Sequence, residues 1–265
     1  MTLSDEQLSH FRKNGFLVLP GFAAEELCDT IKDIALAHLD HKVPPLETEY
    51  EYAVKSKEER EKTVGTGVPG YVKEVSIRRL RQVYERDIVF REWMEDESIR
   101  PILAQVLGET PVITLAHHNS IMTKMPHTST ETRWHQDFRY WHFENDNLVS
   151  VWLALDEENS HNGVLEFIPG SHQMHFSPEQ FDEKEYFSDV VPQNRALIDT
   201  KVSHSLQKGD VVLFHCKLLH RANKNLDDKP KISFVYTVKG KSNKALPGTR
   251  SALFDEVELP MAALP

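Results

Sequence analysis

The stretch Arg133-Trp134-His135-Gln136-Asp137-Phe138 (RWHQDF) opens the part of the chain that decides the fold. It is followed by the apolar run VSVWLAL at 149–155 and by GVLEFIPGSH at 163–172. Because side chains alternate along a β-strand, His135 and Asp137 are expected on one face, where a single metal ion can meet an imidazole and a carboxylate. The three segments together predict β-structure built around a metal site.

A second His-x-Asp triplet, at His38 and Asp40, shows that the triplet alone does not indicate a metal site. It follows Leu27, Ile31 and Ile34, whose spacing is helical, and residues two apart on a helix point to nearly opposite sides. We therefore expect an ordinary helix at His38 and a metal site only at His135 and Asp137.

Composition limits the class of protein. The chain has 265 residues, of which 40% are hydrophobic and 27% are charged, values ordinary for a globular protein. The net charge of −10 argues against binding to nucleic acid or to an anionic membrane, since both need a basic face. The two cysteines, Cys28 and Cys216, are too few for a disulfide framework, and neither a signal peptide nor a membrane span is recognisable. We expect a cytoplasmic protein; the sequence does not indicate its oligomeric state.

Helical patterns dominate residues 1–110. Ser4 and Gln7 have the spacing of a capping box, a second helix is expected over 23–39, and two more follow Asp87 and end at Gly108. Residues 40–70 are rich in charge, glycine and proline, which favours a mobile lid over a site.

After Pro111 the pattern changes to short strands separated by turn residues. The expected strands are 112–115, 121–125, 149–155, 164–168, 211–215 and 232–238. This texture predicts an all-β core with flanking helices, in the form of a jelly roll or cupin-like barrel. We assign residues 1–265 to a single domain, with a mainly helical part at 1–110, the jelly-roll core at 111–240 and a C-terminal extension at 241–265.

A third metal ligand has to come from elsewhere in the core. Two histidines and one carboxylate that leave three positions open are the ligand set of non-haem Fe(II) oxygenases. His220, just beyond the strand at 211–215, is the preferred third ligand. His204 and His215 are alternatives, of which His215 lies within the apolar strand itself.

The strand that begins at Lys231 has two different faces. Ile232, Phe234, Tyr236 and Val238 form an apolar face, whereas Lys231 and Ser233 share the other face. A cation and a hydroxyl two residues apart could hold a carboxylate by one charge-assisted and one neutral hydrogen bond. Lys231 and Ser233 are therefore candidate residues for binding a cosubstrate.

These residues resemble the phytanoyl-CoA hydroxylase family of Fe(II)/2-oxoglutarate dioxygenases. The matching pieces, within roughly 110–240, are WHQD at 134–137, the Trp152 strand, NGVL and IPGSH at 162–172, and His220 with the strand after it. The resemblance implies a double-stranded β-helix that binds Fe(II) through His135, Asp137 and His220. It also implies 2-oxoglutarate and O₂ as further cofactors, and places Gln136 and Trp152 in the cosubstrate pocket.

One departure from the family concerns Lys231, where arginine is the usual residue. Arginine holds a carboxylate through two parallel hydrogen bonds, whereas lysine acts as a point charge. Arg221, Lys224 and Lys229 are alternatives for this role. Pro230 cannot donate to a sheet and marks the strand start, which favours Lys231.

The resemblance implies an enzyme that converts a substrate C–H into C–OH while 2-oxoglutarate is decarboxylated to succinate. The presence of Asp137 favours hydroxylation over halogenation. Alternatives are a desaturase or epoxidase with the same site, an acyl-CoA hydroxylase, and a non-catalytic cupin-like protein that binds or senses a metal.

Cationic residues near the metal motif indicate a small anionic substrate. Arg133, Arg139 and Tyr140 flank the motif, Arg139 has the strand parity of His135, and Arg78, Arg79 and Arg81 form a second cluster upstream. Alternatively, these arginines pair with Glu131, Glu144 and Asp146. The motif also resembles a bacterial branch that includes hydroxylases of 3-deoxy-D-manno-oct-2-ulosonic acid (Kdo), so this acidic sugar is the named candidate substrate.

Overall fold

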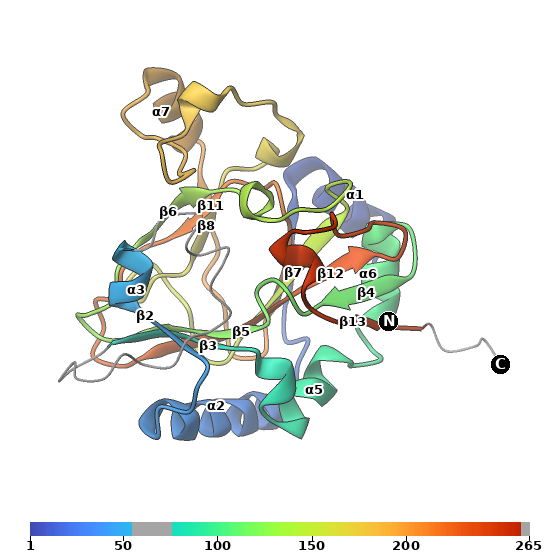
Figure 1. Cartoon of the computed structure of the whole chain (residues 1–265), viewed down its shortest axis with the longest axis vertical. Coiled ribbons are helices and arrows are strands. Elements are labelled where there is room, and N and C mark those ends of the chain that lie inside the picture. The colour runs from blue at the N-terminus through green and yellow to red at the C-terminus, as the bar shows by residue number, and fades with distance from the viewer. Residues whose placement is uncertain (55–75, 261–265) are drawn as a thin grey trace.

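Two antiparallel sheets face each other, and helices cover the outside of the larger one (Figure 1). The computed structural model describes residues 1–54 and 76–260. Within them the larger sheet has nine strands, in the order β1-β10-β7-β12-β5-β3-β2 with β4 between β12 and β13. They are β1 (Phe16–Leu19), β2 (Leu46–Thr48), β3 (Ile77–Arg81), β4 (Pro111–Thr114), β5 (Ser120–Lys124), β7 (Leu148–Ala154), β10 (Val211–His215), β12 (Lys231–Gly240) and β13 (Glu256–Glu258).

The smaller sheet has four strands in the described part of the chain, in the order β6-β11-β8-β9. They are β6 (Thr132–His135), β8 (Leu165–Phe167), β9 (Val202–Ser203) and β11 (His220–Ala222). The predicted all-β core is confirmed, and each of the six strands expected after Pro111 is present within a residue or two of its expected bounds.

Helices occur mainly before the core, as predicted. They are α1 (Asp5–Asn14), α2 (Glu25–Asp40), α3 (Glu49–Val54), α5 (Ile88–Met94), α6 (Arg100–Leu107) and α7 (Pro192–Ile198). Ser4 and Gln7 close the predicted capping box of α1, and Gly15 ends that helix at φ 83°. Of the predicted lid at 40–70, the described residues to 54 include β2 and α3, and 55–70 lie outside the described residues.

The first 110 residues also contribute β1, β2 and β3 to the larger sheet. β1 pairs with β10 and β3 pairs with β5, so this part of the chain completes the core as well as covering it. No helix in the described ranges is long and apolar enough to cross a membrane. The assignment of residues 1–265 to one domain stays a prediction.

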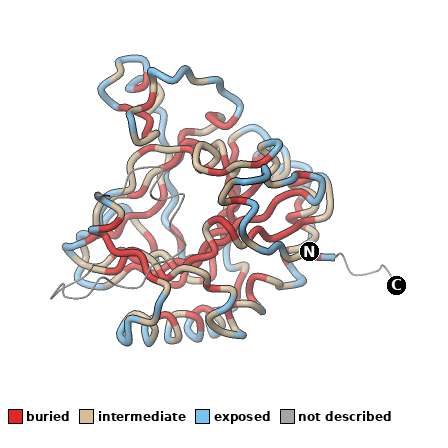
Figure 2. The backbone as a smooth tube through the Cα atoms, in the orientation of Figure 1, coloured by how far each residue is buried: buried red, intermediate tan, exposed pale blue. Residues whose placement is uncertain are grey.

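The two faces of β12 divide the interior, as its sequence predicts. Ile232, Phe234, Tyr236 and Val238 pack in a core that includes residues of α2, α5 and α6. Val235, on the opposite face, packs between the sheets with Trp152 of β7 and Leu165 of β8. The buried strands surround the interior in Figure 2, while the outer side of α2 is exposed. The polar face of β12 is thereby directed toward the space between the sheets.

Candidate metal centre

Pairing of β6 with β11 brings the three expected metal ligands together. His220, the first residue of β11, lies directly opposite His135, the last residue of β6. Ligand atoms of His135, Asp137 and His220 all lie within 4.8 Å of one another. The alternatives lie elsewhere: the His204 ring is 5.7 Å from that of Phe16, and the His215 ring is 5.1 Å from that of His172.

Asp137 reaches this point from a turn and not from a strand. β6 ends at His135, and residues Asp137–Tyr140 form a 3₁₀ helix whose first amide hydrogen bonds join Arg139 to Gln136 and Trp141 to Phe138. The prediction that Asp137 and Arg139 share a strand face with His135 is therefore wrong. The side chains of His135 and Asp137 converge because the backbone turns at Gln136.

Both histidines are oriented by the carbonyl oxygen of the residue two positions earlier. Nδ1 of His135 lies 2.8 Å from the Arg133 oxygen, and Nδ1 of His220 lies 2.9 Å from the Leu218 oxygen. Since a carbonyl can only accept, each Nδ1 carries the hydrogen and each Nε2 is left with a lone pair. Burial, together with His135, lowers the pKa of His220 to about 3, so this ring is neutral, as a metal ligand must be.

Asp137 completes a set of groups that fits a divalent metal ion. Its Oδ1 lies 3.6 Å from Nε2 of His135, and its Oδ2 lies 3.9 Å from Nε2 of His220. Oδ2 is buried and accepts no hydrogen bond from the described residues, which is costly for a carboxylate unless a cation is bound. Burial would raise the pKa of Asp137, but His118 and His220 outweigh it and hold the pKa well below its usual range. Two imidazoles and one ionised carboxylate are the ligands that suit Fe(II) in a site with open positions.

His118 supports Asp137 and was not predicted. The Ser150 hydroxyl lies 3.1 Å from Nδ1 of His118, and Nε2 of His118 lies 3.4 Å from Oδ1 of Asp137. A hydroxyl that donates to Nδ1 leaves the hydrogen of neutral His118 on Nε2, directed at the carboxylate. His118 has φ 53° in the loop between β4 and β5, a conformation that no motif in the sequence announces.

Lys231 and Ser233 hold a carboxylate, as their spacing suggests, but it belongs to the protein. Nζ of Lys231 donates to Oε2 of Glu158 at 2.7 Å, and the Ser233 hydroxyl donates to Oε1 at 2.5 Å. Nε1 of Trp152 also donates to Oε1, at 3.0 Å. Glu158 is fully buried, and this cluster joins three residues named as cosubstrate candidates around one unforeseen acid.

Two cavities share part of their lining, including His135. The inner cavity, about 60 Å³, is lined by His135, His220, Trp152, Lys124 and Lys231, among others. The outer cavity, about 160 Å³, is lined by His135, Asp137, His118, Tyr52, Tyr140, Trp141, Tyr186, Arg78, Arg79, Arg81 and Arg250, among others. His118, Met122, Thr132, His135 and Arg78 line both cavities. A ligand in either cavity would therefore lie beside the candidate metal centre.

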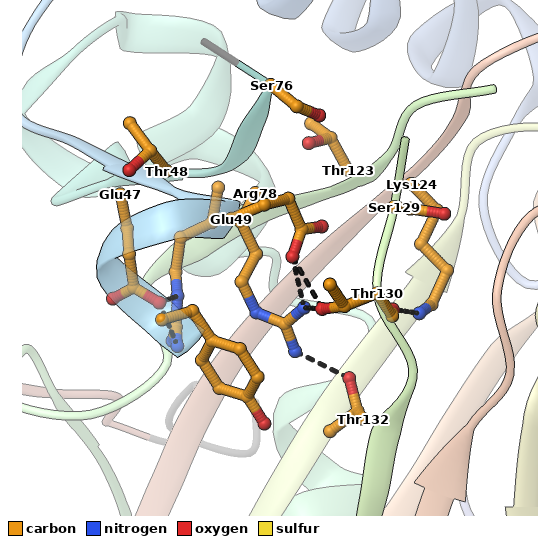
Figure 3. Close-up of polar contacts among 12 residues, drawn as sticks. Glu47, Thr48, Glu49, Ser76, Arg78, Thr123, Lys124, Ser129, Thr130 and Thr132 are labelled. Atoms are coloured by element: carbon orange, nitrogen blue, oxygen red, sulfur yellow. Dashed lines mark hydrogen bonds and ion pairs between the residues drawn. The ribbon is translucent and has the colours of Figure 1, made fainter. Parts of the chain in front are cut away.

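Lys124 is a second unforeseen residue of the inner cavity. It lies directly opposite Lys231 in the pairing of β5 with β12, and its Nζ donates to the carbonyl oxygens of Thr130 at 2.9 Å and Ala222 at 3.4 Å (Figure 3). Burial, then the like charges of Arg78 and Lys231, lower the pKa of Lys124 to about 7. No sequence pattern distinguishes Lys124 from other lysines at strand ends.

The upstream arginine cluster forms one wall of the outer cavity. Arg78 is buried and donates to Oε2 of Glu49 at 3.1 Å, and also to the hydroxyls of Thr130 and Thr132 (Figure 3). Arg79 and Arg81 both pair with Glu47. Burial opposes ionisation of Glu47, but the neighbouring arginines outweigh it and lower its pKa to about 2. The three arginines and the acids beside them, which include Glu51 next to Arg81, form a dense cluster of charge at this cavity.

The other predicted substrate and cosubstrate residues are engaged differently. Arg133 pairs with Asp182 at 2.6 Å, and Nε of Arg139 donates to Glu185 at 2.5 Å. Neither arginine is among the described residues that line the two cavities. Their acidic partners, Asp182 and Glu185, differ from the partners suggested from the sequence, which were Glu131, Glu144 and Asp146. Tyr140 lines the outer cavity, with its hydroxyl donating to the Lys184 oxygen at 2.7 Å. Nε2 of Gln136 donates to the Lys217 oxygen at 2.5 Å, outside the inner cavity.

Comparison with known proteins identifies the family. The family model of phytanoyl-CoA dioxygenase (PhyH) matches residues 11–233, most of the chain and all of the metal candidates. The chain belongs to the PhyH family. It is therefore an Fe(II)- and 2-oxoglutarate-dependent dioxygenase, and iron, 2-oxoglutarate and O₂ are its cofactors, as predicted.

Individual PhyH-family relatives are distant in sequence. An ectoine dioxygenase from Halomonas elongata is 24% identical, with 92% of this chain and 72% of the relative covered. Phytanoyl-CoA dioxygenase domain-containing protein 1 from Bos taurus is 26% identical, with 88% and 89% covered. The crystal structure of EctD from S. alaskensis with 2-oxoglutarate and 5-hydroxyectoine has a TM-score of 0.73 at 20% identity, with 92% of this chain and 78% of that chain covered. These likenesses confirm the predicted jelly-roll fold.

Proposed function

We propose that this PhyH-family enzyme hydroxylates a small anionic substrate in the outer cavity, with Fe(II) held by His135, Asp137 and His220. The observation that carries the proposal is the convergence of two oriented Nε2 atoms on a buried carboxylate whose Oδ2 accepts no hydrogen bond from the described residues. Bound together, iron, 2-oxoglutarate and O₂ supply the oxidation, which yields succinate, CO₂ and the hydroxylated substrate.

The protein's own contribution is to place and orient the ligands. The carbonyl oxygens of Arg133 and Leu218 fix which nitrogen each histidine presents, and His118 holds Asp137 by its Oδ1. Gln136, expected in the cosubstrate pocket, has the role of bracing the turn before Asp137 through the Lys217 oxygen. Such bracing keeps the ligand atoms in position before a metal arrives.

We place the 2-oxoglutarate site in the inner cavity. Lys231 and Lys124 present ammonium groups there, and Trp152 contributes the face of its ring, 4.9 Å from Nζ of Lys231. Ser233 acts behind Lys231 through their shared contacts with Glu158. A dianionic cosubstrate between the metal and two lysines would have each carboxylate near a cation.

The substrate is proposed to be an anion because of the arginines beside the outer cavity. Arg78, Arg79 and Arg81 share Glu47 and Glu49 as acidic partners, and Arg250 lines the same cavity. A concentration of guanidinium groups along one cavity favours a ligand that brings negative charge. Arg81 is the best placed, since its 3.5 Å contact with Glu47 is longer than the 2.8 Å contact of Arg79. We therefore propose Arg81 as the residue that binds the substrate anion, in place of Arg133 and Arg139, which do not line the cavity.

Kdo remains the named candidate among anionic sugars, and its carboxylate would face the β3 arginines. An acyl-CoA ester is the second candidate, since it is the substrate named in the family's description and is also an anion. Desaturation or epoxidation would use the same site and differ only in how the substrate is placed. Family membership favours an enzyme over a non-catalytic metal sensor.

Succinate release in the presence of Fe(II) and 2-oxoglutarate tests the proposal. Carboxylate-bearing sugars should stimulate it more than neutral analogues of the same size, and Arg81→Ala should raise the KM for the acid by about tenfold, the effect of one lost charge-assisted hydrogen bond. Arg139→Ala is the matched control and should leave the KM unchanged. Equal stimulation by neutral and acidic analogues, or a KM effect only in Arg139→Ala, would refute the assigned substrate site.

A further inference from the structure

The carboxylate of Glu158 is bound by the same side chains that were expected to bind a cosubstrate carboxylate. Its carboxylate is fully buried and receives hydrogen bonds from Lys231, Ser233 and Trp152. Its backbone is fixed as well, because the amide and the carbonyl oxygen of Glu158 both bond to Leu206, each at 2.9 Å. The backbone pairing fixes the position of the residue, and the three side-chain donors hold its carboxylate beside Lys231.

Glu158 lies on the far side of Lys231 from the inner cavity. Lys231 and Trp152 line that cavity, whereas Glu158 and Ser233 are not among the described residues that do. Lys231 thus stands between a permanent carboxylate and the space proposed for 2-oxoglutarate. An ammonium has three hydrogens, and the contacts with Glu158 at 2.7 Å and with Ser233 at 3.4 Å, among the described residues, leave the third for a ligand.

The charges around the inner cavity differ in how they are neutralised. Arg78 has Glu49, Arg221 has Glu166 and Lys231 has Glu158 as acidic partners. The ammonium of Lys124 donates instead to the backbone carbonyl oxygens of Thr130 and Ala222. Because Lys124 and Lys231 are cross-strand neighbours, Glu158 also offsets the repulsion between them.

We propose that Glu158 is a positioning residue that weakens the attraction of Lys231 for the distal carboxylate of 2-oxoglutarate, so that Lys124 carries most of this recognition. The inference rests on the proposed cosubstrate site and adds to it a residue that sets cosubstrate affinity and selectivity. Glu158 keeps Lys231 pointing along the cavity while cancelling much of its charge, since an opposite charge in direct contact attenuates the field felt by a third group. Affinity is thereby kept below the value that two uncompensated lysines would give.

The test compares Glu158→Gln with the parent protein by calorimetry, with Fe(II) under argon and two cosubstrate probes. 2-Oxoglutarate is one probe, and 2-oxopentanoate, which lacks the distal carboxylate, is the other. Glu158→Gln should bind 2-oxoglutarate about tenfold tighter, the lower end for one hydrogen bond to a charged group, and should bind 2-oxopentanoate unchanged. This gain in selectivity is a result that a purely structural role of Glu158 would not produce.

Two further variants attribute the gain to Lys231. Glu158→Gln combined with Lys231→Met should lose the gain in 2-oxoglutarate affinity. Glu256→Gln is the matched control, because it removes the carboxylate partner of another buried lysine on β12, Lys239, which is not among the residues lining the inner cavity. It should leave both affinities unchanged. A larger rise of the melting temperature on adding 2-oxoglutarate to Glu158→Gln than to the parent gives a second readout if the variant folds less stably.

The outcomes separate this inference from the proposed function. Unchanged or weaker 2-oxoglutarate binding by Glu158→Gln, with normal binding by the parent, would overturn the role of Glu158 alone. A gain that persists in the double variant would also overturn it. Failure of both the parent and Glu158→Gln to bind 2-oxoglutarate would overturn the inner-cavity site together with this inference.

Discussion

Replacing Lys124 with methionine should stabilise the protein in the absence of cosubstrate and weaken 2-oxoglutarate binding. Lys124 is a buried ammonium whose hydrogen bonds go to backbone carbonyl oxygens, and burial lowers its pKa to about 7. The cost of a charged group beside a cavity is expected to be offset when an anion binds to it. Methionine has a similar length and no charge. The substitution therefore removes both the cost of burying an ammonium and its attraction for a bound anion.

The magnitude follows from the pKa of Lys124. A drop from 10.5 to about 7 is about 3.5 units, or roughly 4–5 kcal/mol of unfavourable interaction in the charged form. Methionine cannot donate to the Thr130 oxygen, and one unpaired buried acceptor costs about 1–3 kcal/mol. The 3.4 Å contact with the Ala222 oxygen is too long to add much to this cost. The net gain should be about 2 kcal/mol.

The difference in unfolding free energy between Lys124→Met and the parent should depend on pH. Between pH 7 and pH 10.5 the unfolded chain holds a proton on Lys124 that the folded chain has lost, so the parent gains stability as pH rises through this window. The advantage of Lys124→Met is therefore complete below pH 7, shrinks as pH rises, and gives way near pH 10 to a lower stability than the parent's, because only the lost hydrogen bonds then count. Urea denaturation of the metal-free proteins at pH 6 and pH 10 measures it.

Lys239→Met is the matched control, because Lys239 is equally buried but pairs with Glu256. It should show no gain at pH 6. The 2-oxoglutarate affinity of Lys124→Met should fall by about 1.5–3 kcal/mol, the range for hydrogen bonds to charged groups. A loss of stability at pH 6, or an unchanged affinity for 2-oxoglutarate, would show that Lys124 is a structural residue and not a binding one.

Three further substitutions test other parts of the structure. Lys231→Ala should cost about 3–5 kcal/mol in urea denaturation because it leaves the buried Glu158 without its cation, and its stability should recover when Glu158→Gln is added. Gly163→Ala should lower the free energy of unfolding by at least about 1–3 kcal/mol, because Gly163 has φ 86° and a Cβ there would lie 2.4 Å from the Asn223 oxygen. An unchanged urea midpoint would contradict this close approach. Asp87→Ala should cost about 1 kcal/mol by removing the cap of α5 at the Val89 amide, and iron binding should stay intact.

The strands and helices were predictable because their signals are local. Period-two alternation in β12, turn residues around β8 and the capping box before α1 each depend on neighbours in the sequence. His135 and His220 could be selected because they lie at the ends of such strands. The three ligand side chains converge in the structure, and their binding of iron stays a proposal.

The parts that were missed depend on contacts between distant segments. Glu158 meets Lys231 across 73 residues, and nothing in the surrounding loop distinguishes it from Glu157. His118 contacts Asp137 from a loop in which its own φ is positive. Lys124 differs from other lysines at strand ends by its burial, which depends on the packing of distant segments. The strand assignment of Asp137 was wrong because the bond from the Phe138 amide to the Cys216 oxygen starts a turn that strand parity ignores.

Iron titration of four histidine and aspartate variants tests the central claim most directly. Calorimetry under argon should find one Fe(II) per chain in the parent protein. His135→Ala, Asp137→Ala and His220→Ala should each lose most of this binding while remaining folded, whereas His38→Ala, in the decoy triplet on α2, should bind as the parent does. Full Fe(II) binding by His220→Ala or by Asp137→Ala would contradict the assignment of the metal centre.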